Sequence, residues 1–152
     1  MPLTQYGQRL YTLSLYGKGK SFIAAGVLLR QQGGYAYVVL HLLCQGIEIC
    51  CKAFLLALDF KKYAGNTGKL YGHDLVKVVD DVLKAFPKLE ALRPDIREEL
   101  TNLNNLYKNH LLRYDSVSDI LVDSKTIPNN LVFRRMAVAL RVAEREFARQ
   151  TL

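Results

Sequence analysis

Residues 34–60 form one long apolar run whose polar positions repeat at helical spacing. These polar residues are separated by four, three, four and seven positions: His41, Gln45, Glu48, Lys52 and Asp59. At roughly 100° per residue they fall within about 60° on a helix, and we call them the polar stripe. A helix that is apolar almost all round lies at the centre of a bundle. The run therefore predicts an innermost helix whose polar stripe is paired with neighbouring groups or solvated.

Length and composition fit one domain that covers residues 1–152. A chain of this length buries enough apolar surface to fold without disulfides, and 50% of its residues are hydrophobic. The net charge of +7 is compatible with a polyanionic partner, although many basic proteins bind none. A charged residue at a bilayer centre costs roughly 2.5–3.5 kcal/mol. We therefore expect residues 34–60 to be a core helix and the protein to have no membrane partner.

The cysteines predict the compartment in which the protein works. Cys44, Cys50 and Cys51 all lie in the predicted central helix. Cys44 and Cys51 are about 10 Å apart along that helix, which is too far for a disulfide, and the adjacent Cys50 and Cys51 point in different directions. Such a set is typical of small buried hydrophobic residues in a reducing compartment. We therefore expect a cytoplasmic protein.

Helical periodicity outside the central run predicts an all-α fold, an up-and-down bundle of five or six helices. Three further helices are expected at residues 73–86, 94–114 and 130–149, with a surface loop at 61–72. The part before residue 30 is either one helix and a loop or two short helices, because Gly17 and Gly19 interrupt it. A turn is expected at residues 31–34, where two glycines follow two glutamines.

No motif in the chain specifies catalysis or a cofactor. Gly19–Lys20–Ser21 lacks the earlier glycine of a phosphate-binding loop, because that position is Ser14. His41, His73 and His110 lack the neighbours at three or four residues that a helical metal site uses. Folding can still bring His41 beside His110, but a hydrogen-bonded core position is favoured for each. We therefore expect no metal and no other cofactor.

The predicted last helix carries a candidate polyanion-binding strip. Arg134, Arg141 and Arg145 fall within roughly 40° of one another. The alternative is an ordinary solvated face, because Glu144 and Glu146 dilute the positive charge.

Three segments occur in an order that resembles the HEPN domain superfamily: Leu40–Ala57, Tyr71–Asp80 and Leu103–Asp115. The similarity spans roughly residues 22–148. Members of this superfamily are helical, often dimeric, and common in prokaryotic toxin–antitoxin and antiviral defence systems. The resemblance implies a HEPN-like bundle, a homodimer and a place in such a system.

Individual residues match the family's central Glu and Lys, its Gly–His–Asp–Leu turn and its later Arg–Tyr pair: Glu48, Lys52, Gly72, His73, Asp74, Leu75, Arg113 and Tyr114. We expect Glu48 and Lys52 to form buried ion pairs or hydrogen bonds, because an unpaired buried charge is costly. His73 and Asp74 are expected to organise the turn into the next helix.

Many HEPN domains are metal-independent ribonucleases that use an arginine ahead of a histidine on a late helix. The arginine stabilises the phosphate charge, and the histidine moves the proton of the attacking 2′-hydroxyl. This chain has the histidine, His110, but the matching positions 103–105 hold Leu, Asn and Asn. We therefore expect a non-catalytic domain that binds RNA, a nucleotide or a partner protein.

Two alternatives remain open. In the first, the chain is a variant ribonuclease in which His110 is the acid and base, and Arg113 or Lys108 binds the phosphate. In the second, it is a purely structural subunit of a defence or toxin–antitoxin complex.

Overall fold

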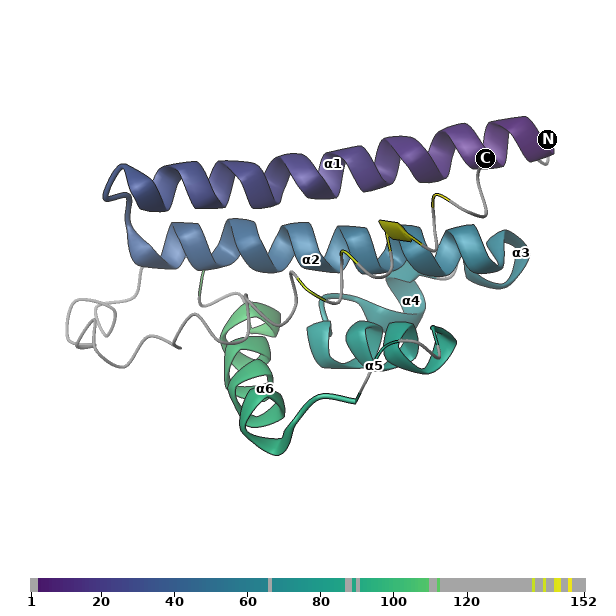
Figure 1. Cartoon of the computed structure of the whole chain (residues 1–152). Coiled ribbons are helices and arrows are strands. Elements are labelled where there is room, and N and C mark those ends of the chain that lie inside the picture. The colour runs from purple at the N-terminus through teal and green to yellow at the C-terminus, as the bar shows by residue number, and fades with distance from the viewer. Residues whose placement is uncertain are drawn as a thin grey trace.

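An antiparallel pair of long helices, α1 and α2, carries the fold (Figure 1). The computed structural model describes residues 3–65, 67–86, 89, 91–109, 112, 138, 141, 144, 145 and 148. Its elements are α1 (Gln5–Gln31), α2 (Ala36–Leu58), α3 (Phe60–Tyr63), α4 (Thr67–Tyr71), α5 (Leu75–Ala85) and α6 (Pro94–Lys108). None of the described residues lies in a strand, so the all-α prediction is confirmed. α6 runs steeply across α2 (Figure 1), which departs from a simple up-and-down arrangement.

α2 is the innermost helix of the described fold, as the apolar run predicts. α1 covers one side of it, and α5 and α6 lie on the other (Figure 1). By length and composition alone α2 could also cross a membrane, but 72% of its most apolar window is buried inside the fold. Such burial is typical of a core helix. The expectation that the protein has no membrane partner stays a prediction.

The predicted break near Gly17 and Gly19 is wrong, because α1 is one continuous helix. The buried residues of α1 are Thr12, Gly19 and Gly26, which are seven positions apart and face α2. A Cβ atom on Gly19 would lie 2.6 Å from Cys50 Sγ and 3.0 Å from the Gly46 carbonyl oxygen. Gly19 therefore lets the two backbones approach closely rather than ending the helix.

Residues next to α1 in sequence determine where it begins and ends. The Thr4 hydroxyl accepts a hydrogen bond from the Gly7 amide at 3.1 Å and so caps the first turn. After the last turn, Gly33 adopts a φ of 72°, a left-handed conformation that glycine tolerates without strain. The turn predicted at residues 31–34 is therefore confirmed.

The predicted loop at residues 61–72 is wrong in part, because it contains the rest of α3 and the whole of α4. Asp59, which belongs to the polar stripe by sequence, instead caps α3 by accepting a hydrogen bond from the Lys62 amide at 3.0 Å. Tyr63 and Tyr71 are buried, and the Tyr71 hydroxyl donates to Asp81 at 2.8 Å. These tyrosines attach the short helices to the core. Of the glycines that suggest a loop, Gly65 lies between α3 and α4, Gly68 lies within α4, and Gly72 follows it.

α5 and α6 begin where the sequence predicts. Asp74 caps α5 by accepting from the Lys77 amide at 3.1 Å, and Pro94 occupies the first turn of α6. The buried face of α6 is Ile96, Leu100, Leu103, Asn104 and Tyr107. The predicted continuation past Lys108, with His110 and Tyr114, lies outside the described residues. So does most of the predicted helix at 130–149, of which residues 138, 141, 144, 145 and 148 are described as helical.

We predict that Gly19→Ala destabilises the protein by about 1–3 kcal/mol, because the new methyl group overpacks the α1–α2 contact. Gly17→Ala is the matched control, because a Cβ there meets nothing within 4 Å. This control should stabilise the helix by roughly 0.5–1 kcal/mol. Urea denaturation measures both changes. Equal effects of the two substitutions would contradict the close packing at Gly19.

Candidate functional site

A buried carboxylate, Glu48, lies at the centre of the polar stripe. Only 3% of its side chain is exposed. It accepts hydrogen bonds from Lys52 Nζ at 2.5 Å and from the Tyr107 hydroxyl at 2.5 Å. His73 Nδ1 lies 3.2 Å from Glu48 Oε2, and because a carboxylate only accepts, this nitrogen carries the proton it donates. Glu48 therefore joins α2 to α6 and to the turn before α5.

Lys52 makes a second contact with the same turn. Its Nζ donates to the Gly72 carbonyl oxygen at 2.9 Å. Gly72 has a φ of 52°, which a glycine adopts at little cost. The side chain of His73, the next residue, is 38% exposed. Of the side chains in contact with Glu48, those of His73 and Lys52 are partly exposed to solvent.

Asp74 forms the second centre of the cluster. It accepts hydrogen bonds from Asn104 Nδ2 at 3.2 Å and from Lys108 Nζ at 2.9 Å. Partial burial would raise the pKa of Asp74, but the hydrogen bonds from Lys108, the Lys77 amide and Asn104 outweigh it and lower the pKa. Asn104 Oδ1 also accepts from the Leu75 amide at 2.7 Å, which satisfies the start of α5.

The ring of Tyr107 connects two histidines that are far apart in sequence. Its centroid lies 5.7 Å from that of His41 and 5.7 Å from that of His73. Its hydroxyl oxygen also lies 3.0 Å from the Gln45 side-chain oxygen. The structure thus brings together predicted site residues from α2, from α6 and from the turn before α5: His41, Gln45, Glu48, Lys52, Gly72, His73, Asp74 and Lys108. We call these residues, with Asn104 and Tyr107, the polar cluster.

The outcome differs for the other predicted site residues. His110, Arg113 and Arg134 lie outside the described residues, so their predicted roles stay predictions. Arg141 and Arg145 are exposed. The one predicted catalytic residue that is described, Lys108, is occupied by its ion pair with Asp74.

Sequence reasoning missed Asn104 and Tyr107 as members of the cluster. Helical spacing alone predicts that Tyr107 lies on the apolar face of the helix expected at residues 94–114, and Asn104 enters the sequence argument only as a position without the family's arginine. The available signal is that a polar side chain on a buried helix face must find a hydrogen-bond partner.

The cysteines and carboxylates offer neither an activated nucleophile nor a metal site in the described part of the chain. Burial raises the pKa of the Cys50 thiol to about 12 and raises the pKa values of Cys44 and Cys51 above their ordinary range. Among the described residues, no three His, Cys, Asp or Glu side chains gather as metal ligands do.

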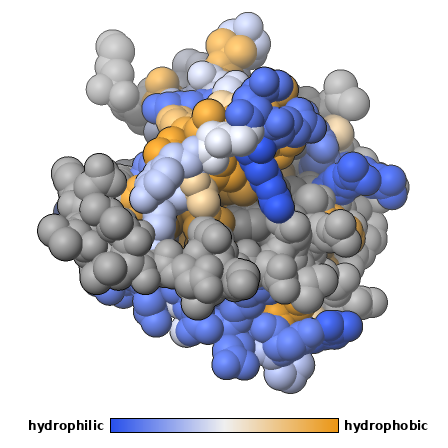
Figure 2. All heavy atoms as spheres, turned by 90° about the vertical axis from the view of Figure 1, so that its left-hand side faces the viewer, coloured by the Kyte–Doolittle hydropathy of each residue, from blue (hydrophilic) through white to orange (hydrophobic). Residues whose placement is uncertain are grey.

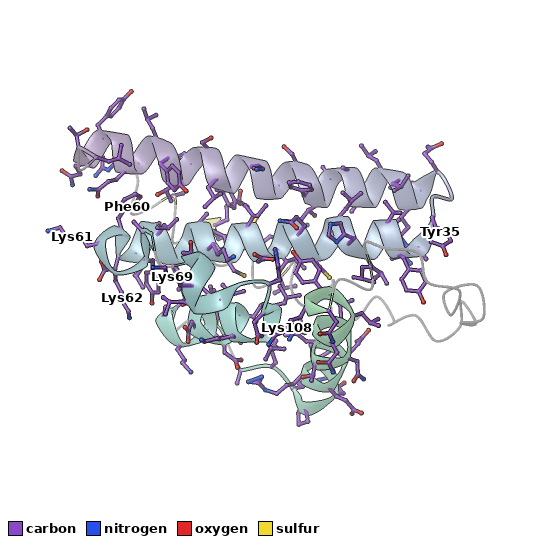
Figure 3. All side chains as sticks on the ribbon, turned by 180° about the vertical axis from the view of Figure 1, so that it is seen from behind. Tyr35, Phe60, Lys61, Lys62, Lys69 and Lys108 are labelled. Atoms are coloured by element: carbon purple, nitrogen blue, oxygen red, sulfur yellow. The ribbon has the colours of Figure 1, made fainter. Side chains whose placement is uncertain are left out.

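A second polar surface lies at the end of the molecule where α1 begins and α3 and α4 lie. Figure 3 shows Phe60, Lys61, Lys62 and Lys69 together at this end, away from Lys108. Arg9 of α1 lines a cavity with Phe60, and the Tyr11 and Phe60 rings meet edge to face at 6.0 Å. We call Arg9, Lys61, Lys62 and Lys69, with the aromatic residues Tyr11 and Phe60, the basic end.

The cations of the basic end are exposed, and none forms an ion pair with a described carboxylate. Cations elsewhere do form such pairs, among them Lys20 with Glu144, Lys52 with Glu48, Arg97 with Asp80 and Lys108 with Asp74. The sequence did not reveal this surface, because residues 9, 61, 62 and 69 come together only through the α1–α2 hairpin.

Comparison of the chain with known protein families, with curated proteins and with solved structures finds no match. The HEPN assignment therefore rests on the residues quoted above and stays a prediction.

We predict that Glu48→Ala destabilises the protein by about 3–5 kcal/mol, because the substitution leaves the ammonium of Lys52 buried without its carboxylate. The control is Lys84→Ala, which breaks the exposed pair with Asp81 at 3.7 Å and should change stability by less than about 1 kcal/mol. Denaturant titration gives both values. A loss below about 0.5 kcal/mol for Glu48→Ala would mean that the polar cluster does not hold the helices together.

Proposed function

We propose that this chain is a non-catalytic, HEPN-like helical domain that binds single-stranded RNA through its basic end. One observation carries the proposal: exposed cations that pair with no described carboxylate lie at the same end as the half-buried ring of Phe60, against which the exposed Tyr11 packs. Proteins that bind single strands combine cations that follow the phosphates with aromatic rings on which bases stack. The net charge of +7 favours association with a polyanion.

The polar cluster supports the non-catalytic part of the proposal. Its carboxylates, Glu48 and Asp74, are each engaged by a lysine and by further hydrogen-bond donors. Lys108, one of the two phosphate ligands that the ribonuclease alternative offers, already pairs with Asp74. A structural role in positioning α5 and α6 accounts for these contacts.

One contact favours a second candidate, a variant metal-independent ribonuclease. The Glu48 carboxylate holds His73 through Nδ1 at 3.2 Å. A carboxylate that fixes the tautomer and orientation of a half-exposed histidine is also a feature of acid–base catalysis. His110 and Arg113, the residues that the sequence suggests for this activity, lie outside the described residues.

The predicted homodimer is kept as part of the proposal. Where α1 turns into α2, at the opposite end from the basic end, Val27, Leu28, Tyr35 and Val38 are exposed. Figure 2 views this end and shows apolar atoms at the surface beside hydrophilic ones. Exposed apolar patches mark interaction surfaces, and a second copy bound here would leave both basic ends open to RNA.

The membership of a toxin–antitoxin or defence system and the cytoplasmic location are proposed on the resemblance and on the reduced cysteines alone. A protein partner in such a system remains part of this proposal.

The first prediction concerns RNA affinity. A fluorescently labelled 12-nucleotide oligouridylate should bind to the wild type, and its affinity should fall as salt rises. Each phosphate contact to a single strand contributes roughly −0.7 to the slope of log K against log salt. The Lys61→Gln/Lys69→Gln variant should therefore make that slope less negative by about 1.4. Fluorescence anisotropy over a salt series measures both quantities.

Lys18→Gln is the control for that experiment, because Lys18 is exposed on α1 about two and a half turns after Arg9. A loss of log affinity in Lys18→Gln half as large as in the double variant, in proportion to the charge removed, would show that overall charge, and not the basic end, binds RNA. RNA cleavage in the presence of EDTA that is lost in His110→Ala or His73→Ala would overturn the non-catalytic part and support the ribonuclease.

The second prediction concerns assembly. The mass of one chain is 17.3 kDa. Light scattering after size-exclusion chromatography should give twice that mass for the wild type. Leu28→Glu should shift the protein toward the monomer, since a buried carboxylate in the interface is costly. The control is Leu70→Glu, at another exposed leucine. A monomeric wild type at micromolar concentration would reject the homodimer.

A further inference from the structure

A cavity of about 210 Å³ opens at the basic end, between the start of α1 and the end of α2. Its walls differ in chemistry. Gln5, Gln8 and Arg9 of α1 form a polar wall, and Leu56, Ala57 and Phe60 form an apolar one. The volume is below the roughly 300–1,000 Å³ typical of pockets for drug-sized ligands. Such a cavity suits a small, flat group with one apolar face and a polar edge.

We infer that this cavity receives one unstacked nucleobase of the bound single strand. The inference rests on the proposed function and assigns a specific site within the basic end. Single-stranded RNA is recognised mainly through bases that leave the stack, pack against aromatic or apolar side chains and form hydrogen bonds along their edges. The two walls of this cavity offer those two kinds of contact.

The apolar wall supplies the packing surface. Phe60 is only half-buried, and its ring is supported from one side by Tyr11, with centroids 6.0 Å apart and ring planes at 86°. Leu56, which is buried, and Ala57 extend the surface along α2. A phosphate group alone would gain nothing from these apolar side chains, whereas the face of a base would.

The polar wall supplies groups for the edge of the base. Gln8 Nε2 donates to the Leu3 carbonyl oxygen at 3.0 Å, which holds the amide in place and leaves its oxygen and its second N–H for a ligand. Gln5 presents another amide from the same wall. An amide offers a donor and an acceptor side by side, which is the pattern that pairs with base edges.

Arg9 places a cation beside the same cavity. It forms no ion pair with a described carboxylate, so its guanidinium is available to the phosphate next to the inserted base. Lys61, Lys62 and Lys69 lie around the same end and extend the path for the rest of the strand.

The test compares two labelled 9-mers that carry the same phosphates. One consists of stable abasic ribose analogues throughout, and the other has a single central adenine. The wild type should bind the one-base strand about tenfold more tightly than the abasic strand. Because only one base is present, no other base can replace it by a shift in register. Equal affinities for the two strands would overturn the base site while leaving RNA binding by the basic end intact.

A variant that fills the cavity locates the site. Ala57→Phe should abolish the preference for the one-base strand without changing the salt dependence of binding, because no charge is altered. Ala25→Phe, at an exposed alanine of α1, should keep the preference. Thermal melts establish that both variants fold. A folded Ala57→Phe protein that keeps the preference would rule out this cavity, and a wild type that binds neither strand at low salt would overturn both the inference and the proposed function.

Discussion

The carboxylate of Glu48 determines how the second half of the described fold is placed against the first. A charge buried to this degree is tolerated only when donors surround it, and its donors come from three places: Lys52 one turn along α2, Tyr107 of α6 and His73 before α5. Here a shift of α6 along α2 would separate a buried hydroxyl from a buried carboxylate, so the polar cluster selects one arrangement.

Features that are determined within one segment of the chain, such as helix starts and the polar side of a helix, could be predicted from the sequence. The polar stripe indicates the side of α2 on which its polar partners lie, and Asp74 and Pro94 mark the starts of α5 and α6. The error at Gly17 and Gly19 has a physical cause. A glycine in a helical pattern can mark either the end of the helix or a close contact with another helix. Which one applies depends on whether another backbone packs against it. For Gly19 that backbone includes Gly46, which lies 27 positions later in the sequence. No local pattern contains that information.

The candidate sites differ in the same way: residues of the polar cluster could be recognised from local motifs, and the residues of the basic end could not. Glu48, Lys52, His73 and Asp74, which carry the resemblance to HEPN domains, meet in one cluster although they come from two separate segments. The buried carboxylate of Glu48 requires hydrogen-bond donors, so a structural role alone explains why these residues occur together. The basic end could not be predicted, because its cations come from α1, α3 and α4 and become neighbours only when the hairpin closes. Charge counted along the sequence drew attention instead to Arg134, Arg141 and Arg145.

The positions of the acidic residues explain why the positive charge of the basic end is available to a ligand. Asp59, the acid nearest in sequence to Lys61 and Lys62, gives a carboxylate oxygen to the Lys62 amide as the cap of α3. Asp81 accepts from the Tyr71 hydroxyl and pairs with Lys84. Both acids therefore contribute to local structure and form no ion pair with the ammonium groups of α3 and α4, of which Lys62 Nζ lies over the Tyr63 ring. Exposed cations repel one another only weakly in water, so the fold tolerates the cluster, and a bound polyanion relieves the repulsion that remains. In the described part of the chain, almost every charge of the polar cluster has a partner and helps to hold the helices, whereas the cations of the basic end pair with no described carboxylate.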